Sequence, residues 1–357
     1  MAIKTTESQA INFLRLFFCV AIVFLHAYTS TQPLEGLENS KPFYEAVTYM
    51  FSLEWGEVGV PVFFVVSGYL FFYGSCLDFQ NYKRKIRSRV KSLLIPYLFW
   101  NFLFIALFFV AEQVPVLSQY FSGVNKRVSD YSWLDFIRAF WDRGEWQGGN
   151  GTPFDWPLWF VRNLFCLCLL SPVVKYFICW FKGWGILALT FIWYWTPGLD
   201  FLFSSVLFFT LGGYFSLIRK ELIVEDKKYL RMLSVVYPLL FLADFFTRGE
   251  AWHLVVHRTA ILTGIFFFFY LAAWGVKKGW VTAKPYYGQL SFLLYVVHNP
   301  VLNVVRKATV SLFPAASDGM SVLLYFADVF IVIGGVAGLF FILQKYFPAF
   351  LRFSAGR

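Results

Sequence analysis

The run INFLRLFFCVAIVFLHAYTS, residues 11–30, decides the class of fold. Its twenty residues are mostly apolar, and about 20 apolar residues in a helix cross the hydrocarbon core of a bilayer. Arg15 and His26 are its only basic side chains. Because the stretch lacks a small-x-small cleavage site, it predicts a retained first transmembrane span and not a cleaved signal peptide.

The same apolar character continues along the chain. Of 357 residues, 59% are hydrophobic and only 15% are charged. This composition excludes a soluble globular enzyme, a disordered chain and a disulfide-rich scaffold. Because the apolar residues come in long runs and do not alternate with polar ones, an outer-membrane barrel is excluded too. Nine further apolar segments follow the first, at residues 58–76, 92–111, 157–180, 184–197, 200–218, 232–247, 258–276, 291–313 and 321–345.

These segments predict an all-α polytopic membrane protein with about ten transmembrane helices. The segment at 184–197 is short and ends at the turn signal Thr196-Pro197-Gly198, so it and 200–218 could form one re-entrant pair. The expected range is therefore nine to eleven spans. No internal repeat is evident, which argues against an inverted-repeat transporter.

The distribution of charge predicts the orientation. The net charge of +10 separates into +16 on the side of the N-terminus and −6 on the other side, once the segments are drawn as alternating spans. Loops rich in Lys and Arg stay in the cytoplasm, so both termini are expected there. This sidedness points to membrane lipids and removes nucleic acid as the default partner of a basic chain.

The longest stretch outside the apolar segments covers residues 112–156 and is expected on the outer side. Within it, apolar residues recur with helical spacing, at Trp133, Phe136, Ile137, Phe140 and Trp141. That pattern predicts an amphipathic helix lying on the outer interface. Residues 1–357 are otherwise expected to form a single membrane domain.

Arg15 and His26 are the most informative residues of the first span, because ionisable groups inside a bilayer are costly. They are eleven residues apart, which is about 16 Å of rise and three turns, so both side chains lie on one face of the helix. That face carries a fixed cation, Arg15, near the cytoplasmic end of the span and a titratable base, His26, deeper in the membrane. The alternative is a snorkelling arginine with an interfacial histidine.

Four further stretches could carry chemistry. The basic run at residues 82–91 has six cations. It suits a polyanion at the inner membrane surface, either anionic lipid or a nucleotide phosphate. In the stretch at residues 59–70, Ser67-Gly68 permits close backbone approach. Glu57 lies just before the start of this stretch. The stretches are GVPVFFVVSGYL (59–70), YKRKIRSRVK (82–91), PLWFVRNL (157–164) and SFLLYVVHNP (291–300).

The sequence predicts no metal site and no bound cofactor. His253 and His257 form an i,i+4 pair, but no HExxH motif or acidic cluster joins them in the sequence. The five cysteines contain no CxxC pair and are interpreted as small core residues. There is no Walker A motif and no dinucleotide glycine fingerprint.

In this order, the motifs resemble the integral-membrane acyltransferase-3 family. The points of resemblance are Arg15 and His26, residues 63–69, the basic run with Pro96, residues 157–162 and residues 291–298, which together cover about residues 10–345. The resemblance implies about ten helices and transfer of an acyl group, usually acetyl, from cytoplasmic acyl-CoA to a hydroxyl of a surface or secreted glycan. It implies the stand-alone form, without a fused esterase-like domain, in the cytoplasmic (inner) membrane of a bacterium. Glu57 departs from the commonest form of the second-span motif.

The resemblance also suggests residue roles. Arg15, Arg84 and Arg87 would bind the phosphates of acyl-CoA, with Ser67 and Tyr69 near the donor, and His26 would be the general base. By this resemblance acyl-CoA, usually acetyl-CoA, is a co-substrate and no cofactor is bound. The oligomeric state is left open. Glu57 and Asp155 are the candidate carboxylates that orient His26. The candidates on the acceptor side are Trp159, Arg162 and His298. The exposed aromatics Trp133, Trp141, Trp146 and Trp156 are candidates for a surface on which a sugar stacks.

Two other classes of protein stay open. A flippase or transporter for a lipid-linked glycan would use Arg15 and the histidines to line its path, although visible repeats are lacking. A structural membrane scaffold would leave the Arg15 and His26 pair unexplained.

Overall fold

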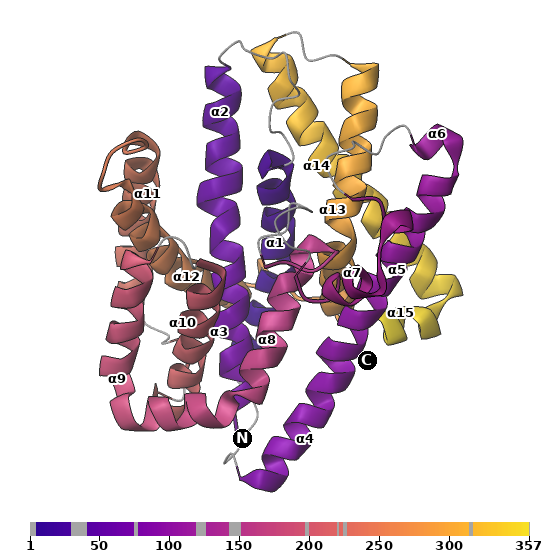
Figure 1. Ribbon diagram of the computed structural model, residues 1–357. Helices are drawn as coiled ribbons and strands as arrows, with labels where there is room; N and C mark the ends of the chain where they lie inside the picture. Colours follow the sequence, from indigo (N-terminus) through magenta and orange to yellow (C-terminus); the bar gives the residue numbers. More distant parts are fainter. Residues whose placement is uncertain are drawn as a thin grey trace.

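The computed structural model describes residues 5–29, 41–74, 78–118, 126–142, 151–196, 200–219, 221–223, 227–313 and 317–356. Within them the chain is helical and has no strand (Figure 1). The first half consists of α1 (Thr5–Thr29), α2 (Pro42–Thr48), η1 (Tyr49–Trp55), η2 (Gly56–Val58), α3 (Gly59–Phe72), α4 (Phe79–Arg89), η3 (Val90–Leu94), α5 (Ile95–Gln113), α6 (Pro115–Ser118), η4 (Val128–Asp130), α7 (Trp133–Arg138), η6 (Trp156–Leu158) and α8 (Trp159–Leu169). The second half consists of α9 (Ser171–Trp195), α10 (Asp200–Tyr214), η8 (Phe215–Arg219), α11 (Lys227–Phe246), α12 (His253–Lys277), α13 (Tyr287–Leu312), α14 (Asp318–Tyr346) and α15 (Pro348–Ser354).

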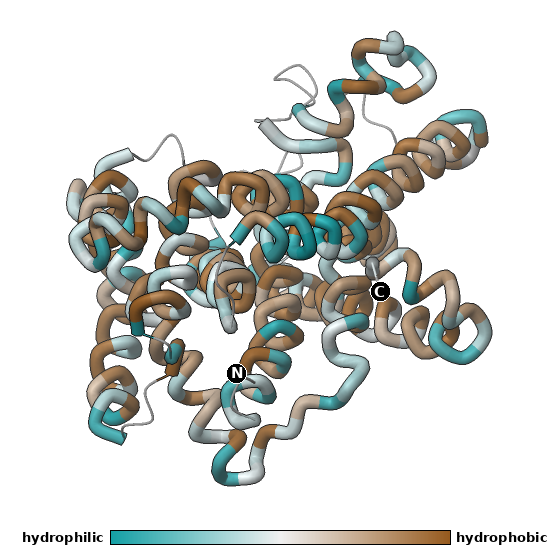
Figure 2. Tube along the Cα trace, turned by 90° about the horizontal axis from the view of Figure 1, so that it is seen from below, coloured by the Kyte–Doolittle hydropathy of each residue, from teal (hydrophilic) through white to brown (hydrophobic). Residues whose placement is uncertain are grey.

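The helices confirm an all-α polytopic membrane protein. Among the described residues, eight helical stretches are long and apolar enough to cross a bilayer. Seen from the end where α1 begins, most helical turns carry hydrophobic residues (Figure 2). Large apolar side chains are exposed on the outer helices, as at Phe102, Trp184 and Phe330, where lipid tails would cover them. The eight stretches are Thr5–Tyr28, Pro42–Phe72, Phe79–Gln113, Ser171–Trp195, Leu202–Arg219, Lys227–Phe246, His253–Lys277 and Asp318–Tyr346.

The structure differs from the predicted segments in one region. The segment expected at 157–180 is not one helix: α8 ends at Leu169, and α9 begins at Ser171 with Pro172 in its first turn. Proline has no N–H to continue the hydrogen bonds of α8, so the chain turns there. A second bend at Lys182, where φ is +48°, sends the rest of α9 upward along the edge of the bundle (Figure 1).

Two of the predicted segments are not among the eight long apolar stretches of the described residues. α8 has 11 residues, which is too short to cross a bilayer by itself. α13, predicted at 291–313, is a 26-residue helix that carries His298, Arg306 and Lys307, and it is not among the eight apolar stretches.

α1 lies in the middle of the bundle, against α3, α12, α13 and α14. Glycines allow the closest helix contacts. A Cβ on Gly68 of α3 would lie 2.1 Å from the Phe209 carbonyl oxygen, and one on Gly212 of α10 would lie 2.0 Å from the Val65 carbonyl oxygen. The close backbone approach predicted at Ser67-Gly68 is therefore confirmed, and it joins α3 to α10.

The described part of the 112–156 stretch contains α7, which is shorter than the predicted amphipathic helix. Ser132 and Asp135 close a capping box at its start. The hydrogen bonds from Lys126 and Ser132 lower the pKa of the Asp135 carboxyl to about 2. Trp133 on α7 is 76% exposed, so its apolar side chain is available to lipid or ligand. The interfacial position of this helix stays a prediction.

The basic helix α4 lies at the end of the bundle where α1 begins (Figure 1). α15 packs near the start of α5, where the Trp100 indole N–H donates to the Ser354 carbonyl at 3.0 Å. The C-terminal helix thus contacts the segment that directly follows the basic run.

Candidate functional site

Two histidines from distant parts of the sequence meet inside the bundle. The ring of His26 on α1 lies 4.9 Å, centre to centre, from the ring of His298 on α13. His26 is 7% exposed and His298 is fully buried. Buried imidazoles in contact with each other are uncommon in a packing core, so the pair is the natural centre of a candidate site.

His298 is held by its own helix. Its Nδ1 lies 2.7 Å from the carbonyl oxygen of Tyr295 and 3.0 Å from that of Leu294. Carbonyl oxygens only accept hydrogen bonds, so Nδ1 carries a proton and the neutral ring has its lone pair on Nε2. Nε2 is buried and has no hydrogen-bond partner among the described residues. The geometry therefore presents a free basic nitrogen in the interior.

The two helices are parallel and in register. One heptad before the histidine pair, the thiol of Cys19 on α1 donates to the Ser291 carbonyl of α13 at 3.2 Å. Arg15 lies a further turn toward the start of α1, half-buried, with its guanidinium 3.5 Å from Asn12 Oδ1. The face of α1 predicted from the spacing of Arg15 and His26 is thus the face that packs on α13.

A short helical turn, η6, closes the site from another side. Trp156 makes an edge contact with His26, with ring centres 4.9 Å apart. The next residue, Pro157, accepts a hydrogen bond from the Tyr295 hydroxyl of α13. Asp155 is buried, its N–H donates to Asn101 Oδ1 at 3.1 Å, and its carboxylate interacts electrostatically with Tyr295. These contacts bring Asp155 into the wall around the histidine pair.

Trp159 and Arg162 follow on α8. Trp159 is buried against Phe64 of α3, with ring centres 6.2 Å apart. Arg162 points to the segment after α7, where its guanidinium donates to the Trp141 carbonyl and lies 4.9 Å from the Trp141 ring centre. Arg162 thus joins α8 to the loop segment predicted on the outer side.

Ser67 and Tyr69 lie on α3, and Tyr69 is fully buried. Its hydroxyl donates to Glu7 Oε2 at 3.1 Å, and Glu7 Oε1 accepts from the Leu222 N–H. This hydroxyl therefore links α3 to the start of α1. Ser67 is half-buried and directly precedes Gly68, the site of the close contact with α10.

Arg84 and Arg87 are exposed on α4, at the end of the bundle where α1 begins. Arg84 donates to Asn81 Oδ1 at 2.6 Å. The neighbouring Lys85 donates to the Phe71 carbonyl and Arg89 lies over the Phe71 ring, so these two cations hold α4 to the end of α3. Of the three arginines predicted to bind acyl-CoA, Arg84 and Arg87 are exposed and Arg15 is half-buried.

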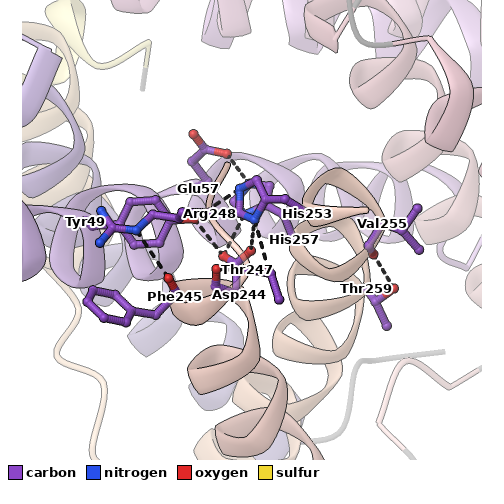
Figure 3. A network of polar contacts seen from close by, with 10 residues as sticks. All are labelled: Tyr49, Glu57, Asp244, Phe245, Thr247, Arg248, His253, Val255, His257 and Thr259. Atoms are coloured by element: carbon purple, nitrogen blue, oxygen red, sulfur yellow. Dashed lines mark hydrogen bonds and ion pairs between the residues drawn. The ribbon is translucent and has the colours of Figure 1, made fainter. Parts of the chain in front are cut away.

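Glu57 is not brought to His26. Its carboxylate accepts from His257 Nε2 at 2.9 Å, in a polar network between η1, η2, α11 and α12 (Figure 3). His253 and Asp244 belong to the same network.

Sequence reasoning missed several residues that the fold places in these two clusters. Asp244 is an ionisable group inside a predicted apolar segment, so the signal that singled out Arg15 and His26 was present for it too. Tyr295 and Cys19 carried no such signal, because a tyrosine or a cysteine in an apolar helix is ordinary core.

Comparison with known proteins agrees with this architecture. The chain matches the acyltransferase-3 family, described as an acyltransferase domain, over residues 8–345. It is 23% identical over 376 residues to succinoglycan biosynthesis protein ExoH of Rhizobium meliloti (strain 1021), a match that covers 98% of this chain and 92% of that protein. No solved structure gives a significant match. With nearly its whole length matched, this multi-pass membrane protein belongs to the acyltransferase-3 family.

Proposed function

We propose that this protein is an O-acyltransferase of a bacterial inner membrane. It transfers an acyl group, acetyl in the first instance, from cytoplasmic acyl-CoA to a hydroxyl of a surface or secreted glycan. The observation that carries the proposal is the buried contact between His26 and His298, in a chain that belongs to an acyltransferase family.

In the proposed reaction His26 is the general base. The acceptor oxygen attacks the thioester carbonyl carbon and forms the new C–O bond, while His26 takes the hydroxyl proton. The tetrahedral intermediate then expels the CoA sulfur as the C–S bond breaks, and the proton passes from His26 to the thiolate. A neutral imidazole suits this task, since it takes the proton in the first step and returns it in the second.

His298 is proposed as the positioning residue of the pair. Its Nδ1–H is fixed on the carbonyls of Leu294 and Tyr295, so its ring has one orientation against His26. A base held by a fixed neighbour keeps the geometry that proton transfer needs. Asp155 and Trp156 are proposed to support the same geometry from η6.

The donor side is proposed at the end of the bundle that carries α4. Arg84 and Arg87 are exposed there, and Arg15 lies nearer than His26 to the start of α1, at the same end of the bundle. Arginine forms paired hydrogen bonds with phosphate, so this set suits the polyanionic end of acyl-CoA. The distance from Arg15 to His26 along α1, about 16 Å, is comparable to an extended pantetheine arm.

The acceptor is proposed to be a glycan because the similar protein ExoH is named for succinoglycan biosynthesis. Exposed Trp133 and Trp141 in the outer segment offer flat surfaces on which sugar rings can stack. Trp146, a further candidate, lies outside the described residues.

The test uses purified protein, labelled acetyl-CoA and a glycan acceptor, and follows both labelled glycan and free CoA thiol. Wild-type protein should produce the two in equal amounts, and the folded His26→Ala variant should produce neither. Arg15→Ala should mainly raise the KM for acetyl-CoA. Full activity of His26→Ala would refute the base assignment, and glycan transport without CoA release would favour the carrier alternative.

A further inference from the structure

A second cluster of ionisable side chains lies apart from the histidine pair, at the end of α11 and the start of α12 (Figure 3). Asp244 on α11 is fully buried. His257 Nδ1 lies 2.8 Å from Asp244 Oδ2, and His253 Nδ1 lies 3.4 Å from Asp244 Oδ1. One ligand atom from each of the three residues falls within 4.8 Å of the other two. The proposed acyl transfer uses none of these residues.

The ring of His257 is held between two carboxylates. Glu57 accepts from Nε2 at 2.9 Å, so Nε2 carries a proton. The Nδ1 that faces Asp244 therefore either carries a second proton or offers its lone pair to a cation. A histidine that donates one N–H to a carboxylate and turns its other nitrogen inward is the usual arrangement of a metal ligand.

Glu54 is a second, independent observation that points to a cation site in this cluster. The side chain is 5% exposed, and neither carboxylate oxygen has a hydrogen-bond partner among the described residues. It interacts electrostatically with Asp244 and His257, so it faces the cluster. A buried carboxylate without a partner is costly unless a positive charge lies beside it.

The cluster gathers carboxylates as well as imidazoles. Three carboxylates, Glu54, Glu57 and Asp244, meet there, and Arg248 is the arginine that interacts with Glu54. The guanidinium carbon of Arg248 lies 4.4 Å from the centre of the Tyr49 ring, and Arg248 is exposed.

We propose that Asp244, His253 and His257 bind one divalent transition-metal ion, with Zn²⁺ the best match to the donors. Two imidazole nitrogens and a carboxylate are borderline ligands that suit zinc, and histidines at i and i+4 present their nitrogens on one helix face. Tetrahedral zinc bonds place neighbouring ligand atoms about 3.3 Å apart. Here one ligand atom from each residue lies within 4.8 Å of the others, and the two histidines approach the two Asp244 oxygens to 2.8 and 3.4 Å.

The neighbouring groups fit the same assignment. Glu57, from η2, orients His257 through its outer nitrogen, and Tyr49 contacts His253 Nε2 through its hydroxyl at 3.3 Å. The ion would tie the end of α11 to the start of α12 and fix both against η1 and η2. Its expected role is to stabilise this corner of the bundle.

The test is the metal content of the whole protein, purified with a tag that contains no histidine. After exposure to Zn²⁺ and removal of the excess, wild-type protein should retain about one zinc per chain by elemental mass spectrometry. Asp244→Asn, His253→Gln and His257→Gln should each lose it. His298→Asn is the matched control, since it removes a buried histidine of the other site and should retain the zinc.

Two further measurements test the site without removing a proposed ligand, and the first of them needs only wild-type protein. Co²⁺ added to wild-type protein should give the strong visible absorption of a tetrahedral site, and Zn²⁺ should displace it. Glu57→Gln should still bind zinc, but about 10- to 100-fold more weakly. Wild-type protein without retained zinc, or zinc that survives in all three ligand variants, would overturn the proposal.

Discussion

The imidazoles of His26 and His298 lie 4.9 Å apart, although 271 residues separate them in the sequence. Parallel packing of α1 on α13 creates the contact, and the Cys19 to Ser291 hydrogen bond sets the register one heptad earlier. Both rings are buried, and the hydrogen bonds of His298 to backbone carbonyls fix the orientation of its ring. The proposed chemistry depends on this relationship.

The first prediction concerns the base. His26→Ala should lower kcat for acyl transfer by about 10²- to 10⁴-fold, the usual contribution of a general base. The KM for acyl-CoA should change little, because Arg15 and α4 are unaltered. A steady-state assay with labelled acetyl-CoA, on protein shown to be monodisperse, checks this prediction.

The second prediction separates the chemical role of His298 from a packing role. In His298→Asn, the side-chain amide can still donate to the Tyr295 carbonyl, but the ring that packs on His26 is absent. The variant should keep the thermal stability of wild type within a few degrees while kcat falls. A variant with unchanged kcat would remove His298 from the site.

The third prediction concerns the donor side. Arg84→Ala and Arg87→Ala should each raise the KM for acyl-CoA about fivefold at low salt, since an exposed ion pair is worth about 1 kcal/mol. The difference from wild type should shrink as salt rises. Arg138→Ala, an exposed arginine on α7, is the control and should leave the KM unchanged. Equal effects of all three substitutions would refute a specific phosphate site on α4.

The fourth prediction concerns the α3–α10 contact. A Cβ on Gly68 would lie 2.1 Å from the Phe209 carbonyl oxygen, so Gly68→Ala should destabilise the fold by about 1–3 kcal/mol. Gly334→Ala on α14, where nothing lies within 4 Å, should be neutral or stabilising by about 0.5–1 kcal/mol. Thermal unfolding in detergent, followed by tryptophan fluorescence, compares the two variants.

Local patterns accounted for the features whose residues are near one another in the chain. The helical period placed Arg15 and His26 on one face, and the structure turns that face toward α13. The break between α8 and α9 was missed although Pro172 marks it, because an apolar run continues on both sides. An apolar run shows how many consecutive residues can lie in the bilayer, but it does not show where the axis of the helix changes direction.

The sequence by itself determined an all-α membrane protein, the common face of Arg15 and His26, and the close contact at Gly68. Each of these follows from composition or from periodicity within one helix. Only the tertiary structure decided that His26 contacts His298. It also decided that Glu57 and Asp244 contact the two ring nitrogens of His257. These partners are 13 to 272 positions apart in the sequence, and their meeting depends on how whole helices pack, which no short stretch of sequence encodes.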